Sequence, residues 1–339
     1  MTAHAATRLR LLGLTLAALS GVGSALQARV NGELAVRLGD GIAAALLSFG
    51  VGLALVGAAT FSSPRGRAGL RRVRAALRPP RPHPPSPAPP RLRWWHCLGG
   101  LGGAAFVAGQ SLTAAVLGVA VFTVAVVGGQ ALSGLAADRF GWGPAGRVPV
   151  TRWRLGGALL TVIAIAVAGG RPAGDGPLLL ALLPAAAGLA VGWQAAVNGR
   201  VRQAAGGALP ATLLNFSVGT AALTLLFGVD VAARGLPAAL PTEPWLYSGG
   251  VLGVAFITVA AATVRFTGVL LLGLATIAGQ VAGSVLLDLT LPGAAGTPGP
   301  RTYLAAALAF AGALTAAVRG TAPAVAGGGR EPVRPHTAR

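Results

Sequence analysis

The sequence has little charge and no lysine at all. Charged residues make up 10% of the 339, against roughly a quarter in an ordinary soluble domain, whereas 54% of the residues are hydrophobic. All 27 basic residues are arginine, and they give a net charge of +19. This charge does not indicate nucleic-acid binding, because the arginines lie between apolar runs and not on a basic soluble face interleaved with aromatics. We therefore expect a lipid bilayer as the main surroundings and no nucleic-acid partner.

Cysteine and histidine are also scarce, which limits metal and redox chemistry. The single cysteine, Cys97, excludes an intramolecular disulfide and a thiolate metal cluster. The four histidines lie in the tails, in a proline-rich segment or at the edge of an apolar run, and they form no metal-ligand spacing or nucleophile–base pair. We expect no metal, no cofactor and no enzymatic activity. A membrane-embedded lipid-modifying enzyme remains open as an alternative.

Long apolar runs dominate the chain. A helix needs roughly 20 mostly apolar residues to cross about 30 Å of hydrocarbon. Runs of about this length, bounded by Arg, Pro or Asp, predict an all-α membrane protein with ten transmembrane helices. The first run also resembles a cleavable signal peptide, but the same pattern recurs in mid-chain, where no signal peptide can lie. The predicted spans are 9–28, 42–62, 95–115, 119–138, 154–170, 178–198, 209–229, 245–264, 267–288 and 302–318.

The distribution of arginine predicts how these spans are oriented. With the N-terminus inside the cell, one side of the membrane holds 22 arginines and the other side holds five, together with six of the eight acidic residues. Positively charged loops are retained on the cytoplasmic side. We therefore predict a multi-pass protein of the plasma (inner) membrane with both termini in the cytoplasm.

One long cytoplasmic segment, residues 64–93, carries nine arginines and the run RPPRPHPPSPAPPR. Proline lacks a backbone donor and clashes with the preceding turn, so the sequence predicts an extended, solvated linker. Its functional interpretation is contact with anionic lipid, and its plainer interpretation, which we favour, is a tether that fixes topology. Residues 320–339 are predicted to form a disordered cytoplasmic tail.

An internal repeat reorganises the whole sequence. The segment QARVNG at 27–32 returns as QAAVNG at 194–199, and SFGVG at 48–52 returns as NFSVG at 215–219, both at an offset of 167. At this offset twelve of the 26 residues from 27 to 52 are identical. Further on, WHCLGGLGGAAF aligns with WLYSGGVLGVAF at an offset of 150, because the first linker is 17 residues longer than its counterpart. The second offset also pairs Gln130 with Gln280 and Asp138 with Asp288.

The repeat divides the chain into halves, 9–170 and 178–319, with five predicted spans each. Because five is odd, the second half must begin on the opposite side of the membrane, so the two five-helix repeats are inverted. Inverted repeats allow alternating access, since exchanging the conformations of the halves converts an inward-open state into an outward-open one. The sequence therefore predicts a secondary transporter, with a channel or a non-transporting scaffold as alternatives.

The ten-span layout resembles the drug/metabolite transporter (DMT) superfamily with its EamA-like architecture. The QxxxN motif near the end of the first span, followed by FxVG and present in both halves, is similar to the YdcZ-like family of inner-membrane exporters. The resemblance covers roughly 9–319 and implies a fused tandem of two family-sized halves. It implies export of a small metabolite or drug-like solute, but it assigns no residue a role.

Three glutamines are candidates for a central solute site. Gln130 and Gln280 each lie about a dozen residues into a span, roughly 18 Å deep, close to the midplane of the hydrocarbon core. An amide at this depth should face the bundle interior, where it binds either a neighbouring helix or solute. We include Gln110 in this predicted substrate-binding set.

Two other sets of polar residues are candidates for gating and coupling. Gln27 with Asn31, and Gln194 with Asn198, are spaced four apart on one helix face and are predicted to form matched gate-edge clusters, with helix capping as the alternative. Asp138 and Asp288 end the fourth and ninth spans, where proton coupling and plain solvation are both open. No carboxylate lies at mid-membrane in the predicted spans.

Overall fold

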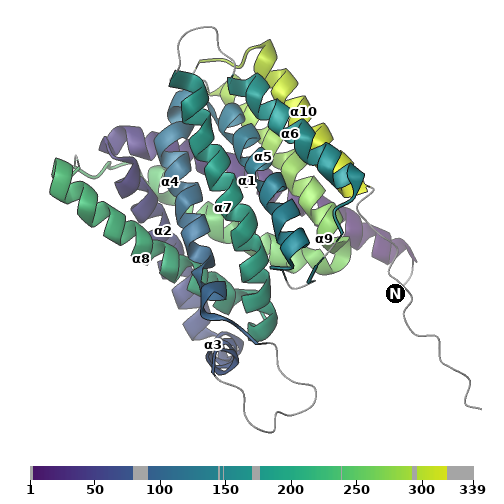
Figure 1. Cartoon of the computed structure of the whole chain (residues 1–339). Coiled ribbons are helices and arrows are strands. Elements are labelled where there is room, and N and C mark those ends of the chain that lie inside the picture. Colours follow the sequence, from purple (N-terminus) through teal and green to yellow (C-terminus); the bar gives the residue numbers. More distant parts are fainter. Residues whose placement is uncertain are drawn as a thin grey trace, which may run out of the picture.

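A computed structural model describes residues 3–78, 91–143, 146–147, 149–169, 176–237, 239–291 and 296–318. Every regular element among these residues is a helix (Figure 1). The α-helices are α1 (Ala3–Leu38), α2 (Gly41–Ser62), α3 (Pro64–Ala76), α4 (Gly100–Leu117), α5 (Val119–Phe140), α6 (Arg152–Gly169), α7 (Gly176–Ala205), α8 (Ala208–Arg234), α9 (Gly249–Thr290) and α10 (Pro300–Val318). Two 3-10 helices, η1 (Trp94–Gly99) and η2 (Pro244–Ser248), precede α4 and α9.

Much of the described chain forms helices that could cross a membrane. Within the described residues six helices are both long enough and apolar enough to do so. The all-helical membrane fold predicted from the sequence is thus confirmed, whereas the count of ten spans stays a prediction. The six ranges are Leu11–Leu38, Gly41–Ser62, Trp94–Leu117, Val119–Phe140, Leu180–Ala205 and Ala208–Arg234.

Matched glycines form the first turn of each repeat. Gly39 has a φ of +63° between α1 and α2, and Gly206 has a φ of +66° between α7 and α8. Both lie in the left-handed region, which glycine enters without the steric cost of a Cβ. After Gly39 the Asp40 carboxylate caps α2, accepting hydrogen bonds from the backbone N–H groups of Ile42 at 2.8 Å and Ala43 at 3.0 Å. The two halves therefore begin with the same helix–turn–helix.

α9 is one run of helical backbone that covers two predicted spans, 245–264 and 267–288. Gly279 and Gly253 of this run both pack on α1, against Ala18 and Gln27 respectively. A straight helix would separate the two glycines by about 39 Å, whereas Ala18 and Gln27 are only about 14 Å apart along α1. α9 must therefore bend back on itself between these contacts.

The two ends of α9 run in opposite directions along α1. Gly249 packs on Asn31 and Gly253 on Gln27, so this end is antiparallel to α1. At the other end Gly283 packs on Val22, beyond the contact of Gly279 with Ala18, so that end is parallel to α1. The bend falls within residues 249–290, where the sequence predicts the turn between two spans.

The helices of the two repeats interlock. α1 packs along α9 of the second repeat, while α7 of the second repeat packs along α4 and α5 of the first. The pairs α2 with α8 and α6 with α10 each join matched helices of the two repeats, and α6 and α10 lie side by side at the upper right of Figure 1. Neither half can therefore bury its apolar surface alone.

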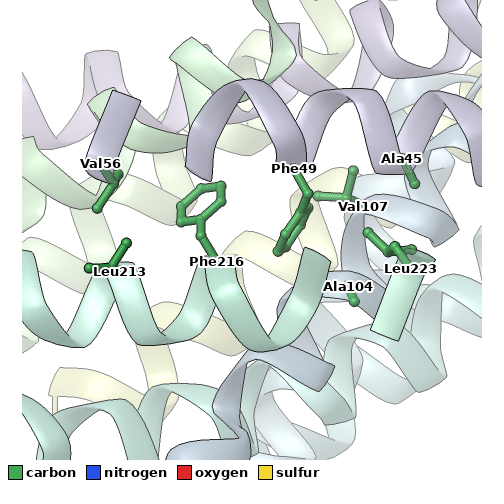
Figure 2. Packing of buried hydrophobic residues seen from close by; sticks show 8 residues of the cluster. All are labelled: Ala45, Phe49, Val56, Ala104, Val107, Leu213, Phe216 and Leu223. Carbon is green, nitrogen blue, oxygen red and sulfur yellow. The ribbon is translucent and has the colours of Figure 1, made fainter. Parts of the chain in front are cut away.

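α2 and α8 are the clearest case of matched helices in contact. Val56 lies against Leu213 at one end of the pair and Ala45 against Leu223 at the other, so the two helices run in opposite directions (Figure 2). Phe49 and Phe216 meet between these ends, with ring centroids 5.0 Å apart and tilted by 42°. Such a buried aromatic pair contributes about 0.5–1.5 kcal/mol beyond its area burial.

The prediction of an extended linker over 64–93 is wrong for its first part, which forms the helix α3. Pro64 lies at the first turn of this helix, where its missing N–H leaves no hydrogen bond unmade, and the Ser63 hydroxyl accepts from the N–H of Gly66. The other prolines of the segment come after residue 78 and fall outside the described residues, and so does the whole predicted tail, 320–339. This first part is rich in arginine and alanine, which favour helix, and the proline cluster begins only after it.

Candidate functional site

A cavity of about 110 Å³ lies between the two repeats. Most of the residues that line it are matched by the repeat, so each half contributes nearly the same set of side chains. The polar lining consists of amides and hydroxyls, and the apolar lining is mainly phenylalanine. The matched pairs are Gln27 with Gln194, Ser48 with Asn215, Phe49 with Phe216, Gly103 with Gly253, Phe106 with Phe256, and Gln130 with Gln280.

Glycines bring the surrounding helices close together at equivalent places. A Cβ on Gly100 would lie 2.2 Å from the carbonyl oxygen of Asn215, and one on Gly250 would lie 2.3 Å from that of Ser48. Backbone atoms cannot move aside as a side chain can, so these positions admit only glycine. The same helix faces place Gly103 and Gly253 against the amides of Gln194 and Gln27. Close helix approach thus presents two glutamines to the cavity.

Gln130 and Gln280 both line the cavity, but their hydrogen bonding differs. Gln280 donates from Nε2 to the hydroxyl of Ser24 at 3.0 Å, which joins α9 to α1. The residue matched to Ser24 is Val191, which has no hydroxyl, so Gln130 lacks the equivalent bond. No described residue forms a hydrogen bond with the side chain of Gln130. Gln280 therefore forms an interhelical hydrogen bond, whereas the amide of Gln130 lines the cavity without a partner in the described chain.

The four gate-edge candidates separate into two positions. Gln27 and Gln194 line the central cavity itself. Asn31 lies outside it and donates from Nδ2 to Oε1 of Gln110 at 2.8 Å, while Asn198 donates to Oδ1 of Asn215 at 2.8 Å. Their roles in gating stay predictions.

Gln110 is fully buried but does not line the cavity. It belongs to α4 and joins α1 through its bond with Asn31, on the side of the bundle where α1 ends. Its Nε2 has no partner among the described residues. The geometry therefore gives Gln110 an interhelical contact next to the cavity.

Asp138 and Asp288 also lie away from the cavity, and they have different partners. Asp288 accepts from the N–H groups of Val119 at 3.0 Å and Ala120 at 2.8 Å, and so caps the N-terminus of α5 from the other repeat. Asp138 forms an ion pair with Arg154 of α6. Sequence reasoning missed the capping role, because an N-cap supplied by a distant helix leaves no local pattern.

Several residues that line the cavity are not predicted as site residues by the sequence, although they belong to the repeated motifs. Ser48, Phe49 and Phe216 belong to the doubled SFGVG and NFSVG segments. Their pairing across the two repeats was the available signal, because a matched residue near the repeat interface meets its counterpart. Within the described residues no group of three or more His, Cys, Asp or Glu could hold a metal ion.

The fold and the cavity define the class of protein, an all-helical membrane protein with a solute-sized cavity between two repeats. The chain belongs to the family DMT_YdcZ, described as "Putative inner membrane exporter, YdcZ", which matches residues 12–167 and again 179–315. This confirms the resemblance predicted from the doubled motifs, since the family is matched twice, once in each half.

Comparison with solved structures supports the fold alone. Five chains match, and one of them, titled "Crystal structure of protein", is 23% identical to this chain. The match covers 91% of this chain and 96% of the other, with a TM-score of 0.50. No curated protein matches this chain.

Proposed function

We propose that this protein is a secondary transporter that exports a small solute by alternating access, with the central cavity as its binding site. The observation that carries the proposal is the lining of that cavity by matched residues of both repeats. A site shared in this way can be exposed to either side by exchanging the conformations of the halves. Membership of an inner-membrane exporter family supports the direction of transport.

The proposal includes two inverted repeats of five spans each, with both termini in the cytoplasm. Matched helices α2 and α8 run in opposite directions, as inversion requires. The two ends of α9 are antiparallel, like α4 and α5 at the matched positions, which favours two spans within residues 249–290. The arginine distribution supports the cytoplasmic termini.

Asp138 and Asp288 support the idea of two alternating conformations. They are equivalent in the repeat, yet only Asp288 caps the N-terminus of a helix from the other half. On the same side of the bundle Asn31 bonds Gln110. We propose that these contacts close one entrance, and that the opposite conformation forms their counterpart around Asp138.

Solute flux in proteoliposomes tests the proposal. Compounds from a panel of metabolites and cationic drugs that raise the melting temperature of the purified protein would be loaded as labelled solutes. A carrier predicts saturable uptake that unlabelled solute on the opposite side accelerates. Flux that never saturates would indicate a channel, and stabilising compounds without flux would indicate a scaffold or a lipid-modifying enzyme.

A further inference from the structure

Two buried polar atoms in the cavity wall have no hydrogen-bond partner in the described chain. They are Oγ of Ser48, on α2, and Oε1 of Gln194, on α7. Ser48 is 2% exposed. At the matched positions Asn215 Oδ1 accepts from Asn198, whereas Ser48 Oγ and the equally unpaired Asn31 Oδ1 both lie beside Gly249. Buried polar groups are nearly always paired, so the unpaired acceptor of Gln194 in the cavity wall indicates a ligand that supplies the missing bond.

The neighbouring glutamines add further unpaired amides. Gln27 and Gln130 line the same cavity, and no described residue hydrogen-bonds their side chains. An amide both donates and accepts, so these two side chains can adapt to either kind of group on a ligand. Gln194 Oε1 can only accept, and its partner must therefore carry an N–H or O–H donor.

The cavity offers no opposite charge to an ion. None of the described lining residues is Asp, Glu, Arg or His. An ion that leaves water for such a site loses its hydration and gains no counter-charge, which is far more costly than burying a neutral polar group. The lining therefore selects against solutes with a net charge.

The size and the apolar wall restrict the ligand further. A cavity needs about 10–15 Å³ to hold one water molecule, so a volume of about 110 Å³ admits a molecule of several non-hydrogen atoms. The apolar wall is formed by matched phenylalanines, with Phe49 and Phe216 in contact across α2 and α8. A small molecule with one hydrogen-bonding end and one apolar end fits both walls.

We propose that the cavity takes a small uncharged solute of the amide or alcohol class, which donates a hydrogen bond to Gln194 Oε1 and forms a second one with the amide of Gln27 or Gln130. The inference rests on the proposed function and names the substrate class of that same site. It predicts that ions of similar size are rejected.

Thiol chemistry at Ser48 tests the charge selection without measuring transport. Because Cys97 is the only cysteine, C97S gives a full-length chain with no thiol, to which S48C adds one in the cavity wall. The detergent-purified protein would react separately with hydroxyethyl, aminoethyl and carboxymethyl methanethiosulfonate, which are neutral, cationic and anionic reagents of similar size. S62C in the same background is the matched control, since Ser62 is exposed at the end of the same helix.

The expected result is a selective loss of reaction with the charged reagents. Relative to their rates at S62C, both ions should modify S48C at least about tenfold more slowly than the neutral reagent does. Equal relative rates, or a faster reaction of the cation or the anion, would overturn the inference.

A protection measurement tests the ligand class directly. Acetamide should slow modification of S48C by the neutral reagent, and acetate, of nearly the same shape, should not. Adding Q194L should weaken the protection by acetamide about tenfold, as expected for one lost buried hydrogen bond. Protection by acetate or tetramethylammonium equal to or greater than that by acetamide would overturn the inference. A failure of the flux assay would contradict the proposed function separately.

Discussion

At the scale of single residues, the repeat explains where two identical amides diverge. Gln130 and Gln280 occupy the same place in their halves, but only Gln280 has a hydroxyl opposite it, because Ser24 is matched by Val191. A difference at one neighbouring position thus leaves one amide in a structural bond and the other facing the cavity. The depth of both residues in the membrane stays a prediction, whereas the structure places both in the lining of one cavity. The missing partner of Gln130 shows only once the helices are paired.

Replacing each glutamine by leucine should separate binding from stability. Q280L removes the bond to Ser24 and should lower the free energy of unfolding by about 1 kcal/mol. Q130L breaks no bond within the described chain and should leave stability nearly unchanged while weakening solute affinity about tenfold. Thermal denaturation and binding of a stabilising solute, measured on both variants, give the two quantities. Normal affinity in Q130L would remove Gln130 from the site.

Glycine-to-alanine substitutions should distinguish glycines that close helix packing requires from those that only reflect a glycine-rich chain. G250A places a methyl group 2.3 Å from the backbone oxygen of Ser48, so the helices must separate, at an expected cost of about 1–3 kcal/mol. Gly57 of α2 has open space around it, and G57A is the matched control that should be neutral or slightly stabilising. Melting temperatures of the two variants test this. A G250A variant as stable as the parent chain would contradict the close packing described for α2 and α9.

At the scale of elements, apolar length and turn residues predicted most helices to within several residues. α2, α5 and α8 begin and end close to the expected positions, because each is bounded by glycine, proline or a capping residue that the adjacent sequence shows. α3 is not predicted, because the proline cluster beyond it favours an extended linker over the whole segment 64–93. The sequence predicts a turn between the spans 245–264 and 267–288, and the contacts of α9 with α1 show that the chain reverses between Gly253 and Gly279.

The carboxylate of Asp288 should hold the N-terminus of α5. In D288A the N–H groups of Val119 and Ala120 lose their acceptor, at a cost of about 1–3 kcal/mol for the local structure. Hydrogen–deuterium exchange of a peptide spanning these amides should accelerate accordingly. D138A is the matched control, because Asp138 bonds Arg154 instead and should leave exchange at α5 unchanged. Equal acceleration in both variants would mean general destabilisation rather than release of this end.

At the scale of the whole molecule, the internal repeat carried more information than any single motif. Residues that it matches, such as Gln130 with Gln280, line one cavity in the structure. It did not show that α1 and α7 each pack on helices of the opposite half. Such interlocking depends on which small residues permit close approach, and glycine and alanine are too common in this chain for their spacing to reveal it.

Alternating access, as we propose it, requires the two halves to be inverted across the membrane. Val36 and Gln203 lie 167 residues apart at matched positions, both exposed in the last turn of α1 and of α7. In the C97S background, V36C and Q203C would each be labelled in intact cells with a membrane-impermeant maleimide, and again after permeabilisation. We predict that V36C is labelled from outside, and Q203C only after permeabilisation. Labelling of both positions from the same side would contradict inversion and, with it, the alternating-access mechanism.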